Sequence, residues 1–449
     1  MARTTAAHSR APIARHGRLR TPSVVARLVA MLAVALGVGV VSSAGVAAFA
    51  VWDAASAVTE NAIVLDEDVQ LPPSLGAIEG GVNILLVGTD SCEGQDVALF
   101  PRCANDDSPG ERNDVTMLVH ISDEPRRVTV VSFPRDMLVP IPACEKPDGS
   151  GTLPAMRSQM INSSYFYGGL GCTVDTVEAL TGETIHAAAA IRWTGVIHLS
   201  DAIGGVDVCV TGDISDKHTG LHLTEGTHTL QGVEALQFLR IRHGIGDGSD
   251  LGRISNQQQF MSSLVRKLQS DSVLANPGVL FSLATTTLSQ VSQGQLVVSS
   301  ALTNPAFMVQ VAMALKDVAY EDIVFVQYPT YYRPGDGRSD VMPVTSAADV
   351  LFQALRDNRP LSLTGEASQG YGVEVEGEAA KPAPAASADP SAPAEGGSPA
   401  GSAPAEGGSP AGDAAASAPP PTEAPAAVEL PSTIAGTTAA QVTCTVPQR

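Results

Sequence analysis

The chain has 449 residues and a formal net charge of −20, from 27 lysines and arginines against 47 aspartates and glutamates. This balance argues against a nucleic-acid binder, which needs a basic stripe. Aromatic residues make up only 4% of the chain, so stacking platforms for single strands are not expected either. The charge is unevenly placed, because residues 1–27 carry six arginines and no acidic residue.

An uncharged apolar span, Leu28–Trp52, directly follows this basic segment. It is longer than the ~20 residues that a membrane helix needs. By the positive-inside rule, arginines before the span and acids such as Asp53 after it place the N-terminus in the cytoplasm and the bulk of the chain outside. The rival interpretation is a cleaved signal peptide, whose apolar region is normally only ~7–15 residues long. The sequence therefore predicts a single-pass protein of the cell membrane, with a cytoplasmic basic segment 1–27, a transmembrane signal anchor 28–52 and an extracytoplasmic stalk 53–80.

All six cysteines lie after the apolar span. An even number in an exported protein indicates disulfides, although six cysteines allow 15 pairings. No Cys-x-x-Cys motif is present, so thioredoxin-type redox chemistry and thiolate zinc sites are not expected. The pair Cys92–Cys103 is favoured first, because it closes a short loop, and Cys144–Cys172 is favoured second. Cys209 and Cys444 would then remain to form the third pair.

Three short apolar runs between Asn83 and Asp136 have the composition of β-strands and carry charged residues at their ends. If they form an antiparallel meander, the end of the first, the start of the second and the end of the third share one edge of a sheet. Two carboxylates facing two guanidiniums there would suit a divalent cation and a phosphorylated ligand. The residues collected at that edge would be Asp90, Arg112, Asp114, Arg135 and Asp136, of which Asp136 is expected to be an ordinary strand-end partner of Arg135.

The rest of the globular region alternates between helical and extended patterns. Helices are expected at 173–180, 194–203, 230–239 and 250–269, and strands at 187–193 and 206–210. This alternation predicts an α/β fold with a mixed, largely antiparallel central sheet between helical layers. From residue 366 the composition changes to Ala, Pro, Gly, Ser and Glu, and a nonapeptide at 393–401 recurs at 404–412. The predicted divisions are a catalytic domain at 81–365, a disordered linker at 366–428 and a short tail at 429–449.

Seven motifs occur in a fixed order across residues 81–270. They are Gly-Thr-Asp90, Arg112-x-Asp114, Ser-Phe-Pro-Arg-Asp136, Ile-Asn162 before Gly-Gly169, Gly-Gly-Val206, Leu230-x-Gly-x-x-Ala-Leu-Gln-Phe-x-Arg-x-Arg-His243, and Asp250-x-Gly-Arg253 before Gln257-Gln258. This ordered set resembles the LytR-CpsA-Psr family of cell-wall glycopolymer transferases.

The resemblance implies a phosphotransferase that takes a glycopolymer joined through pyrophosphate to a polyprenyl lipid. Polymer and one phosphate would move to a hydroxyl of peptidoglycan, and polyprenyl phosphate would be released. The resemblance also implies Mg²⁺ bound by Asp90 and Asp114, with Arg112 and Arg135 beside them in the catalytic centre. Magnesium prefers a few carboxylates with phosphate oxygens, and the guanidinium fork of arginine suits pyrophosphate. The further residues that the resemblance places at the pyrophosphate are Arg240, Arg242, Asp250, Arg253 and Gln257.

Three positions depart from the family's usual pattern. Met160 stands where a lysine is usual, and Arg157 three residues earlier could supply the missing charge. Asn256 replaces a common arginine, and Val115 replaces a frequent threonine. Neither the predicted metal pair nor most of the arginines are affected, so the activity is still expected.

Two other functions are compatible with the same motifs. A polyprenyl-pyrophosphate hydrolase would use water in place of the acceptor hydroxyl, and a non-catalytic protein would only hold lipid-linked polymer. Transcriptional regulation does not suit an exported acidic domain. His218, His222 and His228 have loosely metal-like spacing but no nearby carboxylate pair, so a zinc site there is not favoured. The sequence does not choose between arabinogalactan, teichoic acid and capsule as the polymer.

Overall fold

The computed structural model describes residues 62–65, 81–95, 97–104, 110–270, 273, 276–333, 340–379 and 426–448. All of them belong to one compact unit, Ala57–Arg449. The predicted basic segment 1–27, the signal anchor 28–52 and most of the stalk and linker lie outside the described residues. Among the helices that are described, none is both long and apolar enough to cross a membrane.

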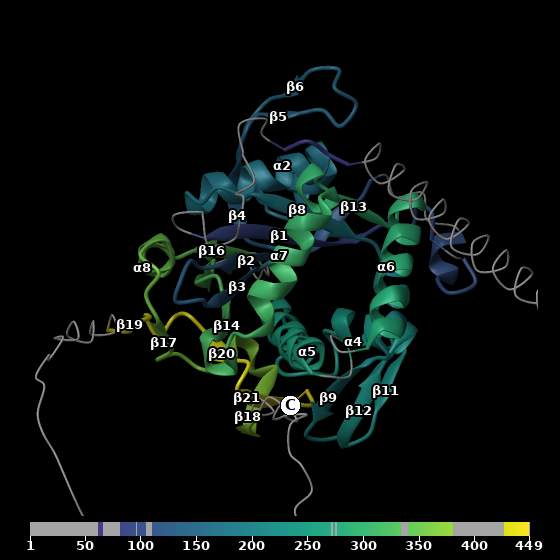
Figure 1. Cartoon of the computed structure of the whole chain (residues 1–449), viewed down its shortest axis with the longest axis vertical. Coiled ribbons are helices and arrows are strands. Elements are labelled where there is room, and N and C mark those ends of the chain that lie inside the picture. The colour runs from purple at the N-terminus through teal and green to yellow at the C-terminus, as the bar shows by residue number, and fades with distance from the viewer. Residues whose placement is uncertain are drawn as a thin grey trace, which may run out of the picture. The chain divides into compact units, whose positions relative to one another are not determined.

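A seven-stranded sheet with the order β13-β8-β1-β2-β3-β14-β20 forms the centre of this unit (Figure 1). Its three middle strands are the antiparallel meander that the sequence predicts. Two strand pairs, β1–β8 and β3–β14, are parallel, and the other four are antiparallel. The expected mixed, mostly antiparallel sheet is thereby confirmed. The strands are β1 (Val82–Asp90), β2 (Arg112–Ile121), β3 (Val128–Phe133), β8 (Ala187–Ile191), β13 (Leu296–Val298), β14 (Ile323–Gln327) and β20 (Gly436–Thr438).

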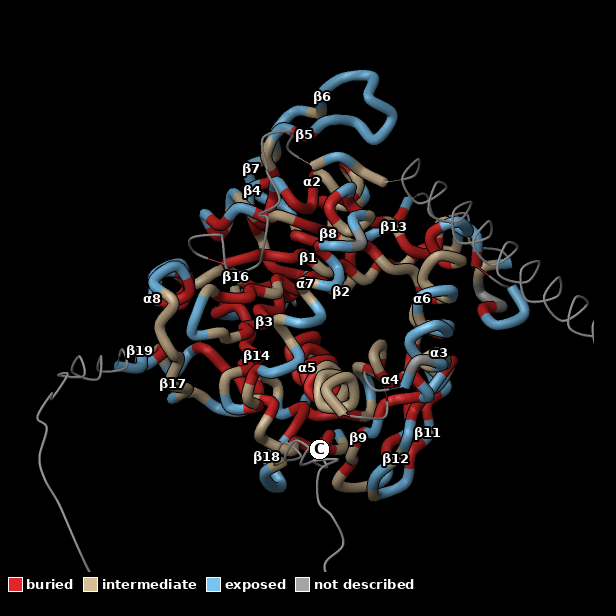
Figure 2. Tube along the Cα trace, in the orientation of Figure 1, coloured by how far each residue is buried: buried red, intermediate tan, exposed pale blue. Residues whose placement is uncertain are grey.

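Helices cover both faces of the sheet, because its strands alternate apolar side chains between two cores. Leu85 and Leu118 pack with α2 and α8 on one face, and Ile84 and Met117 pack with α5 and α7 on the other. Figure 2 shows the strands between these helices as mostly buried. This is the expected layering of helix, sheet and helix. The four helices are α2 (Ser163–Thr181), α5 (Asp250–Gln269), α7 (Pro305–Lys316) and α8 (Thr345–Arg356).

The predicted helix 173–180 is only the second half of α2. Gly168 and Gly169 lie inside α2 with non-helical dihedral angles, and Gly169 has a φ of 69°. The helix therefore continues backwards across a kink to Ser163, which the sequence pattern alone did not indicate. Gly182, with a φ of 72°, ends it in the left-handed conformation that favours glycine.

A second sheet, with the order β12-β9-β21-β18, packs with α4 and α5 around Val208, Leu230 and Phe238. Its strands are β9 (Val206–Val210), β12 (Gly226–Leu230), β18 (Val373–Glu378) and β21 (Gln441–Thr445), and the nearby helices are α3 (Trp193–Ala202), α4 (Gly232–Arg240) and α6 (Pro277–Ser292). Short strand pairs complete the fold: β4 (Leu138–Ile141) with β7 (Met156–Met160), β5 (Cys144–Glu145) with β6 (Thr152–Leu153), β10 (Ile214–Asp216) with β11 (Leu221–Leu223), β15 (Thr330–Tyr332) with β16 (Val341–Pro343), and β17 (Leu361–Ser362) with β19 (Val428–Glu429).

The C-terminal end of the chain is part of the folded domain, which corrects the predicted boundary at residue 365. Residues 366–379 contain β18, where we expected linker. The predicted tail 429–449 supplies β20 to the central sheet and β21 to the four-stranded sheet. Few apolar side chains mark these strands in the sequence, because they are short and one of them reads Gly-Thr-Thr.

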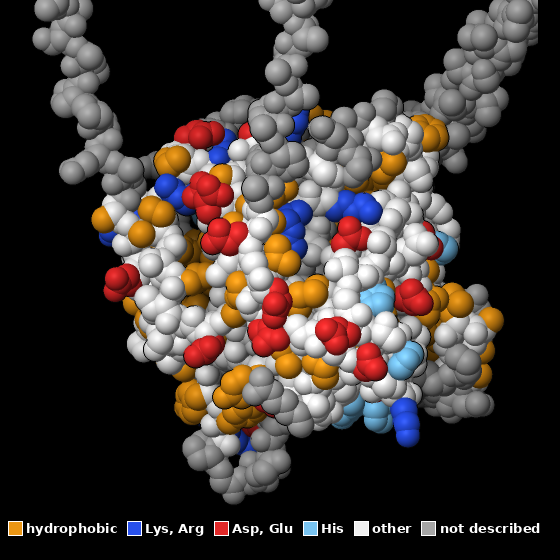
Figure 3. All heavy atoms as spheres, turned by 90° about the horizontal axis from the view of Figure 1, so that it is seen from below, with side chains coloured by type: hydrophobic (Ala, Val, Ile, Leu, Met, Phe, Trp, Pro, Cys, Tyr) orange, Lys and Arg blue, Asp and Glu red, His pale blue; other side chains and the backbone are white. Residues whose placement is uncertain are grey.

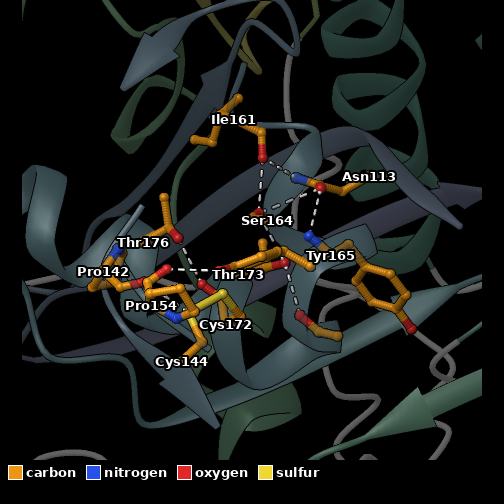
Figure 4. Close-up of a disulfide and its surroundings, with 12 residues drawn as sticks. Asn113, Pro142, Cys144, Pro154, Ile161, Ser164, Tyr165, Cys172, Thr173 and Thr176 are labelled. Atoms are coloured by element: carbon orange, nitrogen blue, oxygen red, sulfur yellow. Dashed lines mark hydrogen bonds between the residues drawn. A yellow bond between two sulfur atoms is a disulfide. The ribbon is translucent and has the colours of Figure 1, made fainter. Parts of the chain in front are cut away.

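All three favoured disulfides are present. Cys209 of β9 is bonded to Cys444 of β21, Cys92 is bonded to Cys103, and Cys144 is bonded to Cys172. No cysteine in the described part of the chain is free. The bond between Cys144 and Cys172 ties the exposed hairpin β5–β6 to α2 (Figure 4).

Candidate active site

The ends of β1, β2 and β3 meet at one edge of the central sheet, as predicted. β1 ends at Asp90, β2 begins at Arg112, and β3 ends two residues before Arg135. Because both strand pairs are antiparallel, these ends lie side by side, and Asp90 is directly opposite Arg112. The sequence argument from strand ends is confirmed here.

A β-bulge in β2 turns Asp114 toward α5. Thr89 pairs with Asn113 while Gly88 pairs with Val115, so Asp114 is the extra residue. Its carboxylate is in ion-pair contact with the side chain of Arg253 on α5. The even-numbered residues of β1 face the same core, and by this alternation Asp90 does too. The two predicted metal ligands therefore share one edge and one face of the sheet.

Asp114 is the centre of a cluster of arginines. Nη1 of Arg135 donates a 2.7 Å hydrogen bond to Oδ1 of Asp114. Nη1 of Arg253 lies 3.7 Å from Oδ2, and Nη2 of Arg253 donates to the backbone oxygen of Asp114 at 3.0 Å. Burial alone would raise the pKa of Asp114, but Arg253, Arg135 and Arg240 outweigh it and hold that pKa below its ordinary value. Asp114 is therefore a fixed negative charge at neutral pH.

Two further carboxylates complete this cluster. Asp250 begins α5, and its Oδ1 lies 2.6 Å from Nη2 of Arg253 and 3.6 Å from Nε of Arg135. Asp136 lies 3.4 Å from Nε of Arg135, as expected for a strand-end partner. Burial raises the pKa of Asp136, and the negative charge of Asp250 adds to that effect. Arginines and carboxylates thus alternate from β3 to α5.

Arg240 and Arg242 approach the cluster from the end of α4. α4 ends at Arg240, and Ile241 after it is extended. The Arg240 guanidinium stacks on the ring of Trp193 at 4.1 Å, and its charge lowers the pKa of Asp114. The charge of Arg242 acts on Asp136. Both predicted arginines therefore act on the same cluster, Arg240 on Asp114 and Arg242 on Asp136.

Arg112 is the exposed arginine of the strand edge. Its Nη1 donates to the hydroxyl of Ser163 at 3.1 Å, and its guanidinium lies 5.3 Å from the ring centre of Phe166. Both partners belong to the first turn of α2. Arg112 is therefore held at the rim of the cluster, where a ligand can reach it from solvent.

Gln257, which we expected at the pyrophosphate, is buried and supports α4. Its Nε2 donates to the backbone oxygen of Leu239 at 2.9 Å. Its neighbour Asn256 donates to the backbone oxygen of Phe238 at 2.7 Å and contacts the hydroxyl of Thr445. These two amides fix the end of α4, and through it they position Arg240. Asn256 in place of a common arginine is thereby explained by its partner on the C-terminal strand β21.

Sequence analysis missed a second ion pair at the same edge. Glu111, directly before β2, accepts a bifurcated hydrogen bond from Nε of Arg192 on its two oxygens, and one of 2.6 Å from Nη2. The hydroxyl of Thr89 also donates to Glu111. Arg192 follows β8, whose end lies beside the end of β1 because these strands are parallel. Its place at the end of a predicted strand was the available signal, but its partner lies 81 residues away in the chain.

Asn113, between Arg112 and Asp114, anchors this part of β2 through a buried polar network (Figure 4). Its Nδ2 donates to the backbone oxygen of Ile161 at 3.3 Å, and its Oδ1 accepts from the N–H of Tyr165 at 3.2 Å. Ser164 donates to the hydroxyl of Thr173 at 3.1 Å across the kink of α2. The strand edge and the first turn of α2 are thus locked together. Met160 ends β7 beside this network, two residues before Asn162, whose N–H donates to the backbone oxygen of Arg135.

The two carboxylates of Asp90 and Asp114 would suit a cation that keeps most of its bound water molecules. Within the described residues, no three His, Cys, Asp or Glu side chains are grouped so that they could hold a metal ion. His218, His222 and His228 therefore do not form such a group either. A cation bound to Asp90 and Asp114 would therefore take its other oxygens from water and ligand, as Mg²⁺ does at phosphates. Both oxygens of Asp250 are buried and accept no hydrogen bond from any described residue.

The arginines also have hydrogen-bonding capacity to spare. In the described part of the chain, the buried Nε atoms of Arg135, Arg242 and Arg253 donate no hydrogen bond. Such unsatisfied donors are rare in folded proteins and indicate a ligand or water. The face seen in Figure 3 carries scattered acidic side chains, in keeping with the net charge of −20. The unsatisfied arginine donors would suit a small, oxygen-rich anion.

The protein is therefore an α/β domain with arginines and carboxylates gathered at one edge of its central sheet. A sequence model of the LytR_cpsA_psr family matches residues 50–356, and the chain belongs to this family. Among related sequences, the cell wall biosynthesis protein LcpA of Corynebacterium glutamicum is 30% identical over 233 residues, which cover 46% of this chain and 44% of LcpA. The polyisoprenyl-teichoic acid–peptidoglycan teichoic acid transferase TagU of Bacillus cereus is 31% identical over 216 residues, which cover 48% of this chain and 62% of TagU.

Solved structures are similar at lower identity. The LytR-Csp2A-Psr enzyme from Actinomyces oris is 22% identical with a TM-score of 0.45, and the match covers 66% of this chain and 96% of that one. A structure described as TagT bound to LIIa-WTA is 21% identical with a TM-score of 0.47, and the match covers 66% of this chain and 98% of that one. The two related sequences, LcpA and TagU, match this chain over less than two thirds of their own length.

Proposed function

We propose that this protein is a membrane-anchored, extracytoplasmic phosphotransferase that attaches a glycopolymer to peptidoglycan. The donor would be the polymer joined through pyrophosphate to a polyprenyl lipid. The uncharged span Leu28–Trp52, with arginines before it and acids after it, supports the anchor and the orientation. Membership of the family and the activity for which the related TagU is named support the reaction.

The transfer exchanges the phosphoanhydride bond of the pyrophosphate for a phosphate ester bond to the acceptor. The acceptor hydroxyl oxygen forms a bond to the phosphorus that carries the glycopolymer. The bond from that phosphorus to the oxygen shared with the lipid phosphate breaks, so polyprenyl phosphate leaves and the hydroxyl gives up its proton. Such a reaction needs positioning and charge neutralisation more than covalent participation by the protein.

The single observation that carries this proposal is the set of buried arginine Nε atoms without acceptors. Arg135 and Arg253 form ion pairs with the carboxylates of the cluster, the charge of Arg242 acts on Asp136, and the buried Nε atom of each of the three arginines makes no hydrogen bond to a described residue. A pyrophosphate has several charged oxygens that would accept from them, and such charge-assisted bonds are about twice as strong as neutral ones. Arg112 at the rim and Arg240 on Trp193 would hold the outer oxygens.

Asp90 and Asp114 would hold Mg²⁺, which when bound neutralises charge on the pyrophosphate oxygens. The lowered pKa of Asp114 makes it a weak base. Its role is therefore to supply fixed negative charge and to orient Arg135 and Arg253. Asp250, which contacts both arginines, would keep them aligned in the same way.

The test uses the full chain in detergent micelles, because β20 and β21 complete both sheets. A short-chain polyprenyl-pyrophosphate glycan serves as donor, with Mg²⁺ and with or without peptidoglycan fragments. Asp114→Asn is compared with Asp357→Asn, which changes an exposed carboxylate at the end of α8. We expect release of polyprenyl phosphate to need metal and acceptor, and to fall about a hundredfold or more in Asp114→Asn only.

The other outcomes identify the competing functions. Release that is equally fast without peptidoglycan would identify a hydrolase. Tight donor binding with no release, unchanged by Asp114→Asn, would identify a binding protein and would direct attention to Met160.

A further inference from the structure

Two helices of the domain, α6 and α7, expose apolar side chains. Leu280 and Phe281 of α6 are 39% and 63% exposed, and Met308, Val309 and Met313 of α7 are 44%, 62% and 58% exposed. Figure 2 shows exposed stretches on α6. The two helices follow one another in the chain, separated by residues 293–304, and large exposed apolar groups are typical of interaction surfaces.

The composition of this region is the second observation. No residue from 272 to 315 is charged, in a chain with a net charge of −20. Helices that are apolar on all sides are normally buried in a core or in a membrane. Here, among the described side chains, α7 buries only Phe307, and α6 buries only Gln290 and Val291. Both helices therefore bury only part of their apolar surface. Leu283 and Leu288 of α6 and Val311, Ala314 and Leu315 of α7 are half-buried against the domain, and the five side chains above stay exposed.

The third observation is where the chain enters the domain. Ile63 forms a parallel bridge with Ser299, and its N–H donates to the backbone oxygen of Val298 at 2.9 Å. Ser299 lies in the short connection between α6 and α7. Only residues 53–62 separate the apolar span Leu28–Trp52 from this bridge. An extended chain of that length reaches at most roughly 33–36 Å.

We infer that α6 and α7 form a membrane-docking face that rests on the outer surface of the lipid bilayer. The occupant is the bilayer itself, because the tether holds this uncharged face close to lipid while the acidic remainder of the domain stays in water. Burying Phe281, Leu280, Val309 and the two methionines in the acyl boundary would supply the missing cover. The inference rests on the proposed membrane anchor, and it adds a defined orientation of the folded domain relative to the bilayer.

Photocrosslinking of the full chain in phosphatidylglycerol/phosphatidylethanolamine vesicles tests this orientation. p-Benzoylphenylalanine replaces Phe281 or Met313, and the matched control replaces Tyr371, which is 68% exposed on another part of the surface. We expect lipid adducts at both helix positions in roughly tenfold excess over Tyr371, the ratio that burial of one phenylalanine side chain supplies. In parallel, Phe281→Glu with Met313→Glu should slow turnover of a long-chain donor in vesicles and leave a water-soluble short-chain donor unaffected.

The possible failures are distinguishable. A chain that does not float with vesicles overturns both the anchor and this inference. A chain that floats, with equal or no lipid adducts at Phe281, Met313 and Tyr371, overturns the docking face and leaves the proposed function standing. Adducts between two copies of the chain, in place of lipid adducts, would identify a dimer interface and would also overturn it.

Discussion

Cys444 in the last strand is covalently bonded to Cys209 in β9, although 235 residues separate them in the chain. The bond holds the C-terminal segment 426–448 on the domain after the intervening linker. The same strand places the hydroxyl of Thr445 against the amide oxygens of Asn256 and Gln259 on α5. The far end of the chain thus supports the helix that carries Arg253.

Removing this long-range disulfide should destabilise the domain strongly. In the chain-entropy account, a disulfide stabilises more when it closes a longer loop. We expect Cys209→Ser with Cys444→Ser to lower the free energy of unfolding by about 2–5 kcal/mol. Cys92→Ser with Cys103→Ser, which opens a loop of sequence separation 11, is the matched control and should cost less. Urea unfolding measures both, and an equal or smaller loss for the long-range pair would show that the C-terminal segment does not need its tether.

Thr445→Val should also destabilise the domain without changing its shape. A hydroxyl can donate to only one acceptor at a time, so Thr445 serves the two amide oxygens alternately. Valine would leave both oxygens buried without a donor, at a cost of about 1–3 kcal/mol. Thr443, buried on the same strand, provides the control Thr443→Val. Equal losses for the two variants, measured by thermal or urea unfolding, would argue against a specific role for Thr445.

Arg253→Lys should impair binding of pyrophosphate while it keeps the charge. Arg253 contacts Asp250 and the backbone oxygen of Asp114 through Nη2, and the Asp114 carboxylate through Nη1, an arrangement that the single amine of lysine cannot reproduce. We expect titration calorimetry with a short-chain polyprenyl pyrophosphate to show affinity reduced by about tenfold or more. Arg266→Lys, at the other end of α5, should bind like the wild type. Unchanged affinity in Arg253→Lys would remove Arg253 from the pyrophosphate site.

The buried His120 should make stability depend on pH in mild acid. Burial lowers the pKa of His120 to about 4 from 6.5, and nearby His186 adds to this effect. Its Nδ1 is 2.8 Å from Oδ1 of Asn83, so the neutral ring donates there. Because the unfolded chain binds this proton more tightly, the free energy of unfolding should fall as pH drops from about 6.5 toward 4, by roughly 3 kcal/mol at most.

Urea unfolding at several pH values between 4 and 8 checks this slope. His120→Gln should flatten it, whereas His198→Gln, at an exposed position of α3, should leave it unchanged. A wild-type slope that persists in His120→Gln would assign the pH dependence to other groups.

The strand edge was predictable because it needs only local patterns. Apolar runs that are bounded by Asp90, Arg112 and Arg135 determine which side chains share an edge of the sheet. This does not depend on which helices pack on the sheet. Asp250 and Arg253 reach that edge only when α5 packs against it, and the resemblance to a family supplied that information. The bulge at Asp114, which turns its side chain toward α5, has no sequence signature in β2.

The long-range features could not be read from the chain in the same way. Arg192 and Glu111 pair through the parallel contact of β8 with β1, which no local pattern specifies. Gln257 looked like a ligand residue, but its amide is used by the end of α4. The C-terminal strands are short and follow a linker of low complexity, so their packing depended on partners far away in the sequence.

The central claim is that the cluster around Asp114 and Arg253 transfers polymer together with one phosphate. The most direct measurement is mass spectrometry of peptidoglycan fragments after incubation with the full chain, Mg²⁺ and a donor whose polymer-linked phosphate carries ¹⁸O. We predict an acceptor whose mass rises by the polymer and one labelled phosphate, and no such product with Asp114→Asn. An acceptor that gains polymer without phosphate, or the same product from Asp114→Asn, would contradict the account.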